Sequence, residues 1–507
     1  MKKINLFILL FLIGFLVYIP SLFGRFFWDD FDFITDNRYV TEMRVDRFFT
    51  NDVIAGRGKI SNYYRPLQSL TYAAIYKLFG PIPFFYHLTN NLFHTGAAIA
   101  IFLFFTEISS NLIISFFIAL IFLIHPVQTE AVSYASGLSD PLFAFFGFLS
   151  LFFFLKRTKK KYYIFSLIFF ILSLLSKELG LVFLGLIFLA WLFEKKRKNI
   201  LNLLPYALIS LIYIAFHLSF INKENIKLSW GNTLYSSSAL VRFLTFIHNL
   251  FAYIGLIIFP KDLFMERDFS IKIITNPINR YLILFILINV LVVFLIFKIR
   301  KKIKHFNLVI FSYLAFFGSF FPVSGIMLIN GIFYEHFLYL PTVFFISFLF
   351  FIFESFFNKK ILIAISFIIG VLIIRSILRQ LDWIDPVRFY NQTLEYAPQS
   401  WRIRNNLGMA YAEKGDLVSA IKQYNNTIQL NNHIPNPYYN LGNAYLSLGQ
   451  LATAEGYFKK AIDVDPNFIF SYSSLLNLYR FTNQRTKLEQ LINLIHHKFP
   501  HLQISLD

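Results

Sequence analysis

Cysteine is absent from this chain of 507 residues, which excludes disulfide bonds and thiolate metal sites. Charged residues are also scarce, at 15% of the chain, whereas soluble proteins average about 25%. Hydrophobic residues make up 57%. Many apolar runs approach or exceed the roughly 20 residues that are needed to cross a bilayer. The sequence therefore predicts a polytopic membrane protein with a soluble tail.

A small-x-small cleavage site is missing before Arg25 in the N-terminal apolar run, which ends at Phe23. A secretory signal peptide would need such a site, so we expect a retained first span. The net charge of +19 lies almost entirely in the membrane portion and gathers in short loops. This pattern is typical of membrane orientation and does not indicate nucleic-acid binding.

Basic connectors separate many of the apolar segments and predict the topology. The segments lie near residues 4–23, 88–106, 112–127, 140–155, 162–176, 179–193, 200–220, 240–259, 279–298, 306–322, 335–353 and 360–378. The connectors are Lys2-Lys3, 156–161, 195–198, 298–304 and 359–360. The positive-inside rule places these connectors and the N-terminus in the cytoplasm, and the chain after about residue 379 outside. All the basic connectors fall on the cytoplasmic side only if 240–259, which contains Arg242, His248 and Asn249, is re-entrant or interfacial. About eleven spans then remain.

The tail repeats itself at a shift of 34 residues. Leu407-Gly408 matches Leu441-Gly442, and Gly415 matches Gly449. Units are expected near 402–435 and 436–469, with a degenerate unit at 470–503. The pattern is similar to tetratricopeptide repeats, which pair two antiparallel helices per unit and bind peptides or proteins on a concave face. A structural cap or a dimer contact is the alternative role.

Acidic residues crowd the first outer loop, residues 24–87, which carries seven of the 28 acids. Asp29 and Asp30 begin this loop at the membrane surface, beside Trp28. Desolvation there would raise carboxylate basicity, which suits a base that deprotonates a hydroxyl. Solubility of the loop is the alternative explanation. The same pair could hold a divalent cation such as Mg or Mn, although no spacing typical of a metal site is present.

Further ionisable residues fall at segment ends that the topology places on this outer side. Such residues are costly near a membrane and are functional candidates. Arg65 suits a phosphate, because its planar fork matches two oxygens, although it could also anchor to lipid headgroups. The other candidates are His87, His125, Glu130, Asp140, Lys177, Glu178, Glu335 and His336.

Taken in order, these motifs resemble the transmembrane and tetratricopeptide-repeat-containing O-mannosyltransferases and their bacterial relatives, in the GT-C glycosyltransferase superfamily. The resemblance covers nearly the whole chain. The motifs are Phe27-Trp28-Asp29-Asp30, Tyr64-Arg65-Pro66-Leu67, Tyr86-His87-Leu88-Thr89-Asn90, His125 through Val132, Ser176-Lys177-Glu178 and Glu335 through Pro341, followed by Trp383 and the repeats. One departure stands out: where the family has Glu-Arg before Leu-Tyr-Leu-Pro, this chain has Glu335-His336.

The resemblance implies an all-α architecture, with a transmembrane glycosyltransferase domain over 1–380 and a repeat domain over 381–507. It implies inverting transfer of a sugar, mannose by analogy, from a polyprenyl-phosphate donor to a protein or glycan hydroxyl. Asp29 and Asp30 would then be catalytic or would bind a metal, and Arg65, Lys177 and His336 would be candidates for binding the donor phosphate. Composition suggests a bacterial inner-membrane protein with a periplasmic repeat domain.

Three rival functions are distinguishable. A membrane-anchored scaffold would use only the repeats and would leave the outer-face motifs unexplained. A transporter predicts ionisable groups near the bilayer midplane and an internal repeat of the spans, neither of which is evident. Transfer of a whole oligosaccharide differs only in the size of the donor, which the sequence does not report.

Overall fold

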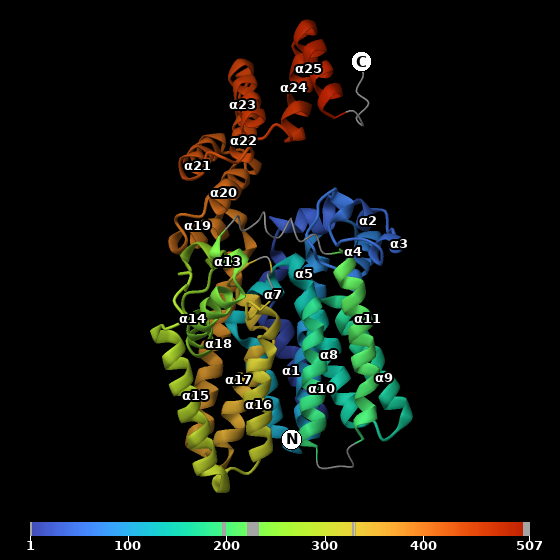
Figure 1. Ribbon diagram of the computed structural model, residues 1–507, viewed down its shortest axis with the longest axis vertical. Helices are drawn as coiled ribbons and strands as arrows, with labels where there is room; N and C mark the ends of the chain where they lie inside the picture. The colour runs from blue at the N-terminus through green and yellow to red at the C-terminus, as the bar shows by residue number, and fades with distance from the viewer. Residues whose placement is uncertain (1–2, 195–198, 221–232, 327–328, 330, 500–507) are drawn as a thin grey trace. The chain divides into compact units, whose positions relative to one another are not determined.

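The computed structural model describes residues 3–194, 199–326, 329 and 331–499 except 221–232, and it divides into two compact units, Met1–Asp385 and Pro386–Asp507 (Figure 1). The described residues form helices and connecting turns without a β-strand, which confirms the all-α prediction. The predicted connectors at Lys2 and 195–198, and the end of the third repeat at 500–503, lie outside these residues.

The first unit is a bundle of long helices joined by short ones. The long helices are α1 (Lys3–Val17), α4 (Pro66–Phe79), α5 (Pro83–Ser109), α6 (Leu112–Ile124), α8 (Ser139–Leu155), α9 (Lys160–Ser176), α10 (Val182–Phe193), α11 (Leu204–Phe220), α14 (Ala239–Ile258), α15 (Arg280–Ile299), α16 (Phe306–Ser319), α17 (Pro341–Phe353) and α18 (Lys359–Ile384). The short ones are α2 (Arg38–Thr41), α3 (Val45–Phe48), α7 (Thr129–Ser133) and α13 (Leu234–Ser237).

Each apolar segment expected from the sequence contains a helix, and several are long enough to cross a membrane. Among the described residues, eight helices pass on length and composition, or nine if the bent pair Leu112–Ile124 and Pro126–Ser133 is one span. Two further apolar helices, Glu178–Phe193 and Pro341–Phe356, are shorter. The chain thus has the features of a multi-pass membrane protein, and the count of about eleven spans stays a prediction.

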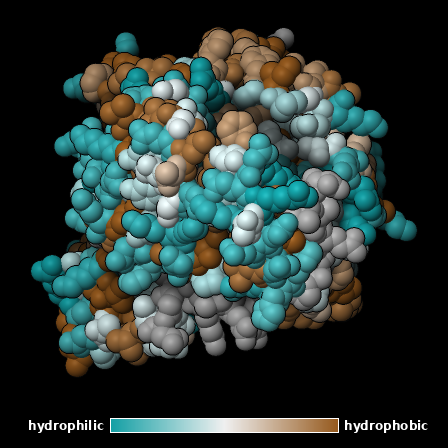
Figure 2. Space-filling model, turned by 90° about the horizontal axis from the view of Figure 1, so that it is seen from above, coloured by the Kyte–Doolittle hydropathy of each residue, from teal (hydrophilic) through white to brown (hydrophobic). Residues whose placement is uncertain are grey.

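The centre of the bundle is filled by aromatic side chains. Phe104 of α5 contacts Phe148 of α8 and Phe311 of α16, with ring centroids 5.9 and 6.0 Å apart. The flanks differ: α11, α15 and α18 expose many large hydrophobic side chains, as lipid-facing helices do. The space-filling view from above shows hydrophilic and hydrophobic residues side by side on the surface that faces the viewer (Figure 2).

The two ends of the bundle have different chemistry. We call the end that carries residues 24–82 the loop face, and the end that carries Lys156, Arg157 and Lys304 the basic face. At the basic face, Lys156 pairs with Glu107 and Lys304 with Glu354. These pairs bring the ends of α5, α8, α16 and α17 together.

Helix α14 lies along the loop face. Near its start, Arg242 donates to the Gly325 carbonyl (2.7 Å), and near its end the Ile257 carbonyl accepts from His125 (2.9 Å). Between them, Tyr253 stacks on Phe333 with centroids 3.9 Å apart. These partners belong to the loop face, so both ends of α14 remain there. Although α14 is long and apolar enough to cross, its contacts favour the predicted interfacial placement.

The second unit begins with α19 (Pro386–Tyr396) and continues as three helix pairs. The pairs are α20 (Trp401–Glu413) with α21 (Leu417–Leu430), α22 (Asn436–Ser447) with α23 (Leu451–Val464), and α24 (Ile469–Phe481) with α25 (Arg485–Lys498). Gly415 and Gly449 turn the first two pairs at φ +82° and +74°, in the left-handed region that favours glycine. Asn483 occupies the equivalent place in the third pair at φ +55°, so the degenerate copy keeps the turn without the glycine.

Gly442 allows the two helices of the second pair to approach closely. A Cβ there would lie 2.4 Å from the Phe458 ring, whereas a Cβ at Gly456 would meet nothing within 4 Å. We expect Gly442→Ala to destabilise this unit by about 1–3 kcal/mol through overpacking. Gly456→Ala should stabilise it by about 0.5–1 kcal/mol, because alanine favours the helix. Limited proteolysis of the full chain measures both effects, and equal cleavage rates in the two variants would contradict the packing argument.

Candidate active site

Asp29 and Asp30 lie in different environments. Asp30 is fully buried, and its carboxylate accepts hydrogen bonds from the backbone N–H groups of Phe27 (3.1 Å) and Ser136 (2.8 Å) and from the Ser136 hydroxyl. Asp29 is half-buried, and its backbone N–H donates to the Tyr134 hydroxyl (2.8 Å). Trp28 precedes it in the left-handed region, at φ +55°, a strained conformation for a bulky residue. Such strain is typical of functional segments. Asp30 is therefore anchored by its side chain, while Asp29 is the less buried of the two residues.

Burial raises the pKa of Asp30 to about 7, although the hydrogen bonds from Ser136 and Phe27 oppose the shift. The unfolded chain has a pKa of about 4 at this residue. The folded state therefore binds the proton more tightly, and the stabilisation is complete below about pH 4 and is lost as the pH rises through about 7.

Asp30→Asn should remove this dependence. We expect the melting temperature of the wild type to fall more steeply than that of Asp30→Asn between about pH 4 and about pH 7. Asp46→Asn, in an exposed part of the same loop, is the matched control and should keep the wild-type slope. Parallel slopes in wild type and Asp30→Asn would refute the raised pKa.

The segment from Tyr134 to Asp140 connects the candidate residues. Tyr134 bonds to Asp29 and Ser136 to Asp30, as described above. Ser139 accepts from Arg65 (3.4 Å), and Asp140 pairs with Lys177. The segment is itself held by Asn90 of α5, whose amide donates to the Tyr134 carbonyl (2.7 Å). Its turn of 3₁₀-helix thus brings residues that are far apart in the sequence to one place.

Two buried ion pairs lie beside this segment. Arg65 donates to both oxygens of Glu178, at 3.0 and 2.6 Å, and its guanidinium stacks over Tyr63. Lys177 donates to both oxygens of Asp140, at 2.7 Å each, and both side chains are 4% exposed. Arg65 and Lys177, which were predicted to bind phosphate, are each paired with a carboxylate. The two ion pairs also hold α4, α8 and the start of α10 together.

Arg65→Lys should show the value of the bidentate geometry. A lysine cannot span both oxygens of Glu178, so we expect a loss of stability of about 1.5–3 kcal/mol, the range for one hydrogen bond to a charged group. Arg57→Lys is the control, because Arg57 pairs with Asp32 at the surface, where ion pairs contribute about 0–1 kcal/mol. Thermal unfolding measures both, and equal losses would contradict the prediction.

Glu130 holds the segment of the loop face that contains Glu335 and His336. Its carboxylate accepts from the His336 ring at Nδ1 (2.6 Å) and from the backbone N–H of Glu335 (2.9 Å). Because a carboxylate here only accepts, the proton resides on Nδ1 of His336. The contact fixes the chain at the point where it enters α17.

Glu335 is fully buried and lies between two arginines that sequence reasoning did not select. Arg267 donates to Glu335 at 3.2 Å, and Arg379 lies 3.7 Å from its other oxygen. Arg379 also pairs with Asp382 (3.4 Å) and faces Trp383. Arg379 is fully buried on α18, one residue past the predicted segment 360–378. An arginine near the end of an apolar segment, four residues before a tryptophan, was the available signal.

Trp383 lies between the segment that contains Asp29 and the residues around Glu335. Its ring lies 5.5 Å from the Tyr134 ring and 5.9 Å from Phe27, and the Arg379 guanidinium lies 5.7 Å from it. Aromatic contacts therefore run from the Asp29 segment to the arginines around Glu335.

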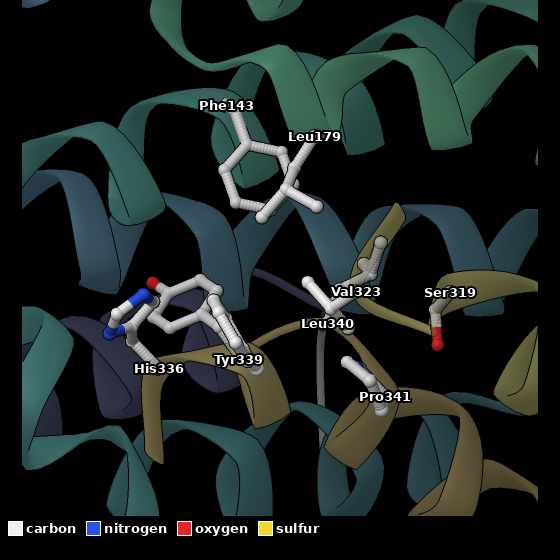
Figure 3. A pocket seen from close by; sticks show the side chains of 9 residues that line it. Phe143, Leu179, Ser319, Val323, His336, Tyr339, Leu340 and Pro341 are labelled. Atoms are coloured by element: carbon white, nitrogen blue, oxygen red, sulfur yellow. The ribbon is translucent and has the colours of Figure 1, made fainter. Parts of the chain in front are cut away.

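A small pocket opens beside His336. Its lining comes from two directions (Figure 3): Phe143 and Leu179 lie on one side, and His336 and Tyr339 on the other. Phe143 is on α8 next to the Lys177–Asp140 pair, and Leu179 follows Glu178. The pocket is thus bordered both by the buried ion pairs and by the Glu130–His336 contact.

Two predicted site residues have other surroundings. His125 donates through Nε2 to the Ile257 carbonyl, and its Nδ1 accepts from the Val127 N–H (3.3 Å), so it anchors the end of α14. His87 is fully buried, and a Cβ at Gly24 would lie 3.0 Å from its Nε2. Both residues hold elements of the loop face together.

The donor set around Asp29 and Asp30 does not fit a protein-held divalent cation. Within the described part of the chain, no three His, Asp or Glu side chains gather as a metal would require. Both oxygens of Asp30 already accept hydrogen bonds from protein donors. We therefore assign no step to a metal.

The repeats match known families. The described part of the tail contains matches to "Tetratricopeptide repeat" over residues 435–468 and to "TPR repeat" over 408–449. The tail is therefore a tetratricopeptide-repeat array, as its period predicted.

Curated relatives match over both units or over shorter stretches. Protein O-mannosyl-transferase F38B6.6 of Caenorhabditis elegans is 26% identical over 412 residues, which is 78% of this chain and 59% of that protein. Protein O-mannosyl-transferase TMTC1 of Homo sapiens is 35% identical over 136 residues, 25% of this chain and 15% of its own. TMTC3 of Mus musculus is 34% identical over 148 residues, 28% and 16%. The chain thus spans well under two thirds of these relatives.

Proposed function

The homologues of this chain are the transmembrane O-mannosyltransferases with tetratricopeptide repeats, and on that basis we propose that it is an integral-membrane glycosyltransferase of GT-C type. It moves a sugar, mannose by analogy, from a polyprenyl-phosphate donor to a hydroxyl of a protein or glycan, with inversion. Residues 1–380 carry the reaction and residues 381–507 bind the acceptor. The observation that supports this most strongly is the convergence on the segment from Tyr134 to Asp140.

Asp29 is the catalytic base in this proposal, and Asp30 is a positioning residue. Asp29 takes the proton of the acceptor hydroxyl as its oxygen attacks the anomeric carbon and the bond to the lipid phosphate breaks. Asp29 is only partly buried, whereas the carboxylate of Asp30 is fully buried and held by Ser136 and Phe27. A base of this kind supplies about 10²–10⁴ in rate.

The donor phosphate binds beside Glu335, near Arg267, Arg379 and His336. Cations there stabilise the negative charge that grows on the departing phosphate. In this proposal Arg65 and Lys177 do not bind the phosphate and instead hold neighbouring helices in place through their ion pairs with Glu178 and Asp140. This assignment replaces two of the three predicted phosphate ligands by arginines and keeps His336.

The proposed setting is the inner membrane of a bacterium. The N-terminus and the basic face lie on the cytoplasmic side, following the positive-inside rule. The loop face and the repeats then lie in the periplasm, where the acceptor docks on the repeats.

The test is transfer from a labelled polyprenyl-phosphate sugar in purified membranes. Wild type should transfer the sugar, and Asp29→Ala at matched expression should not. Absence of transfer from a panel of such donors, with the repeats still capturing proteins, would instead support a membrane-anchored scaffold.

A further inference from the structure

His94 and Tyr339 form a hydrogen-bonded pair inside the bundle. His94 belongs to α5, Tyr339 lies just before α17, and both side chains are fully buried. The Tyr339 hydroxyl lies 2.6 Å from Nδ1 of His94, and Nε2 of His94 lies 3.0 Å from the Leu123 carbonyl oxygen. Because a carbonyl only accepts, Nε2 carries the proton and Nδ1 accepts from the Tyr339 hydroxyl. Both ring nitrogens of His94 are therefore bonded, each to a different segment of the chain.

The bond to Leu123 caps the end of α6. Leu123 is in the last turn of this helix, where backbone carbonyls lack the partners that a continuing helix would supply. The N–H four residues later, of Val127, donates instead to the His125 ring (3.3 Å). His94 therefore satisfies a buried carbonyl at the point where the chain leaves α6 and turns toward Glu130.

The bond to Tyr339 anchors a second segment. Tyr339 directly follows the 3₁₀ turn Glu335–Leu338, and its backbone N–H donates to the His336 carbonyl (3.1 Å). Its ring packs edge-on against Phe122 of α6, with centroids 5.2 Å apart. Tyr339 also lines the same small pocket as His336 (Figure 3). A hydroxyl bonded to α5 therefore limits the movement of the turn that carries His336.

The two segments that His94 anchors are the two that meet at the Glu130–His336 hydrogen bond. Leu123 precedes Glu130 along one segment, and Tyr339 follows His336 along the other. The Glu130–His336 bond joins positions 206 residues apart, and at this point each segment is a turn or a short helix. The position of each segment therefore depends on anchors such as His94, which holds both.

We propose that His94 and Tyr339 are positioning residues for the donor phosphate, which hold Glu130 and His336 at the separation that sets the His336 ring beside the phosphate. The inference rests on the proposed function, which assigns His336 to the donor. A pair that served packing alone would change the amount of folded enzyme, which scales the rate at every donor concentration and leaves KM unchanged. A pair that acts through His336 changes KM for the donor.

Tyr339→Phe removes only the hydroxyl of the pair. We expect it to raise KM for a polyprenyl-phosphate sugar about three- to tenfold, the range for the loss of one hydrogen bond, and to change kcat less. Tyr313→Phe is the matched control, because its hydroxyl donates to Asn289 of α15, and it should leave KM unchanged. In a His336→Gln background, Tyr339→Phe should add less than about twofold, because the residue through which it acts is gone. An unchanged KM in Tyr339→Phe, or an equal rise in both backgrounds, would overturn the inference.

Two substitutions of His94 separate its two bonds. The amide of His94→Asn ends near the place of Nδ1 and still accepts from the Tyr339 hydroxyl. The amide of His94→Gln ends near the place of Nε2 and still donates to the Leu123 carbonyl. We expect His94→Asn to keep KM close to wild type and His94→Gln to raise it as Tyr339→Phe does. The reverse order would show that the Tyr339 bond does not position His336.

A readout without a donor separates failure of this inference from failure of the proposed function. Diethyl pyrocarbonate acylates a ring nitrogen that carries no proton, which in His336 is Nε2, because Nδ1 donates to Glu130. In the full-length protein in nanodiscs, mass spectrometry should show His336 modified at least about threefold faster in Tyr339→Phe than in wild type or Tyr313→Phe, since a lost hydrogen bond favours local opening. Faster modification without transfer from any donor would support the positioning of His336 and refute the enzyme. Transfer by wild type with equal modification in all three proteins would overturn the positioning and leave the enzyme standing.

Discussion

Asp29→Asn is expected to lower kcat by about 10²–10⁴ while leaving the fold intact, which is the range that a general base contributes. Asparagine keeps the size of the side chain and the backbone N–H that donates to Tyr134. It cannot accept the proton of an attacking hydroxyl. Transfer from a polyprenyl-phosphate sugar at saturating donor measures the loss.

The matched control is Tyr134→Phe, which removes only the hydroxyl that accepts from Asp29. This change should lower activity less than Asp29→Asn, because the carboxylate remains and only its positioning weakens. Activity of Asp29→Asn within about threefold of wild type would exclude Asp29 as the base, since that factor is far below the contribution of a general base.

The sequence predicted most of the helical framework because hydrophobic length and helical period are local properties. Each apolar segment, including 162–176 and 335–353, contains a helix, and the repeat period predicted the helix pairs of the tail. The prediction that 240–259 is re-entrant or interfacial rests on Arg242, His248 and Asn249 and stays a prediction, since this helix is also long and apolar enough to cross. Its contacts with Gly325, Phe333 and His125 could not be read from the sequence, because they depend on tertiary packing.

The candidate site was predictable in part. Motif residues such as Asp29, Asp30 and Glu130 stand out because ionisable groups are costly at span ends. The partners of each residue were not predictable, because hydrogen bonds such as Ser136 to Asp30 join positions 106 residues apart. Arg65 and Lys177 illustrate the difference, since residue type alone suggested phosphate binding, whereas Glu178 and Asp140 already hold them.

The folded chain also brings two further arginines, Arg267 and Arg379, to the candidate site. Arg267 and Arg379 were not selected from the sequence, because single arginines near helix ends often anchor to lipid headgroups. In the folded chain they flank one buried carboxylate, Glu335. Arg267 and Arg379 both face Glu335, Arg379 also pairs with Asp382, and His336 donates to Glu130.

Arg379→Met is expected to cost about 3–5 kcal/mol of stability, the range for removing one partner of a buried ion pair. Arg379 and Glu335 are both fully buried, so the change leaves a carboxylate inside the protein with only Arg267 to compensate it. Arg375→Met is the control, because Arg375 lies one turn earlier on α18 and donates to the backbone carbonyls of Pro260 and Lys261. Thermal unfolding in nanodiscs measures the difference.

A second substitution distinguishes structural support from phosphate binding. Arg379→Met combined with Glu335→Gln removes both charges, so it should recover much of the stability lost in the single variant. We expect the double variant to remain at least tenfold weaker than wild type in KM for the polyprenyl donor, because the cation that faces the phosphate is still missing. Recovery of both stability and KM would show that Arg379 only compensates Glu335, and the phosphate site would then have to be sought beside Arg267 and His336 alone.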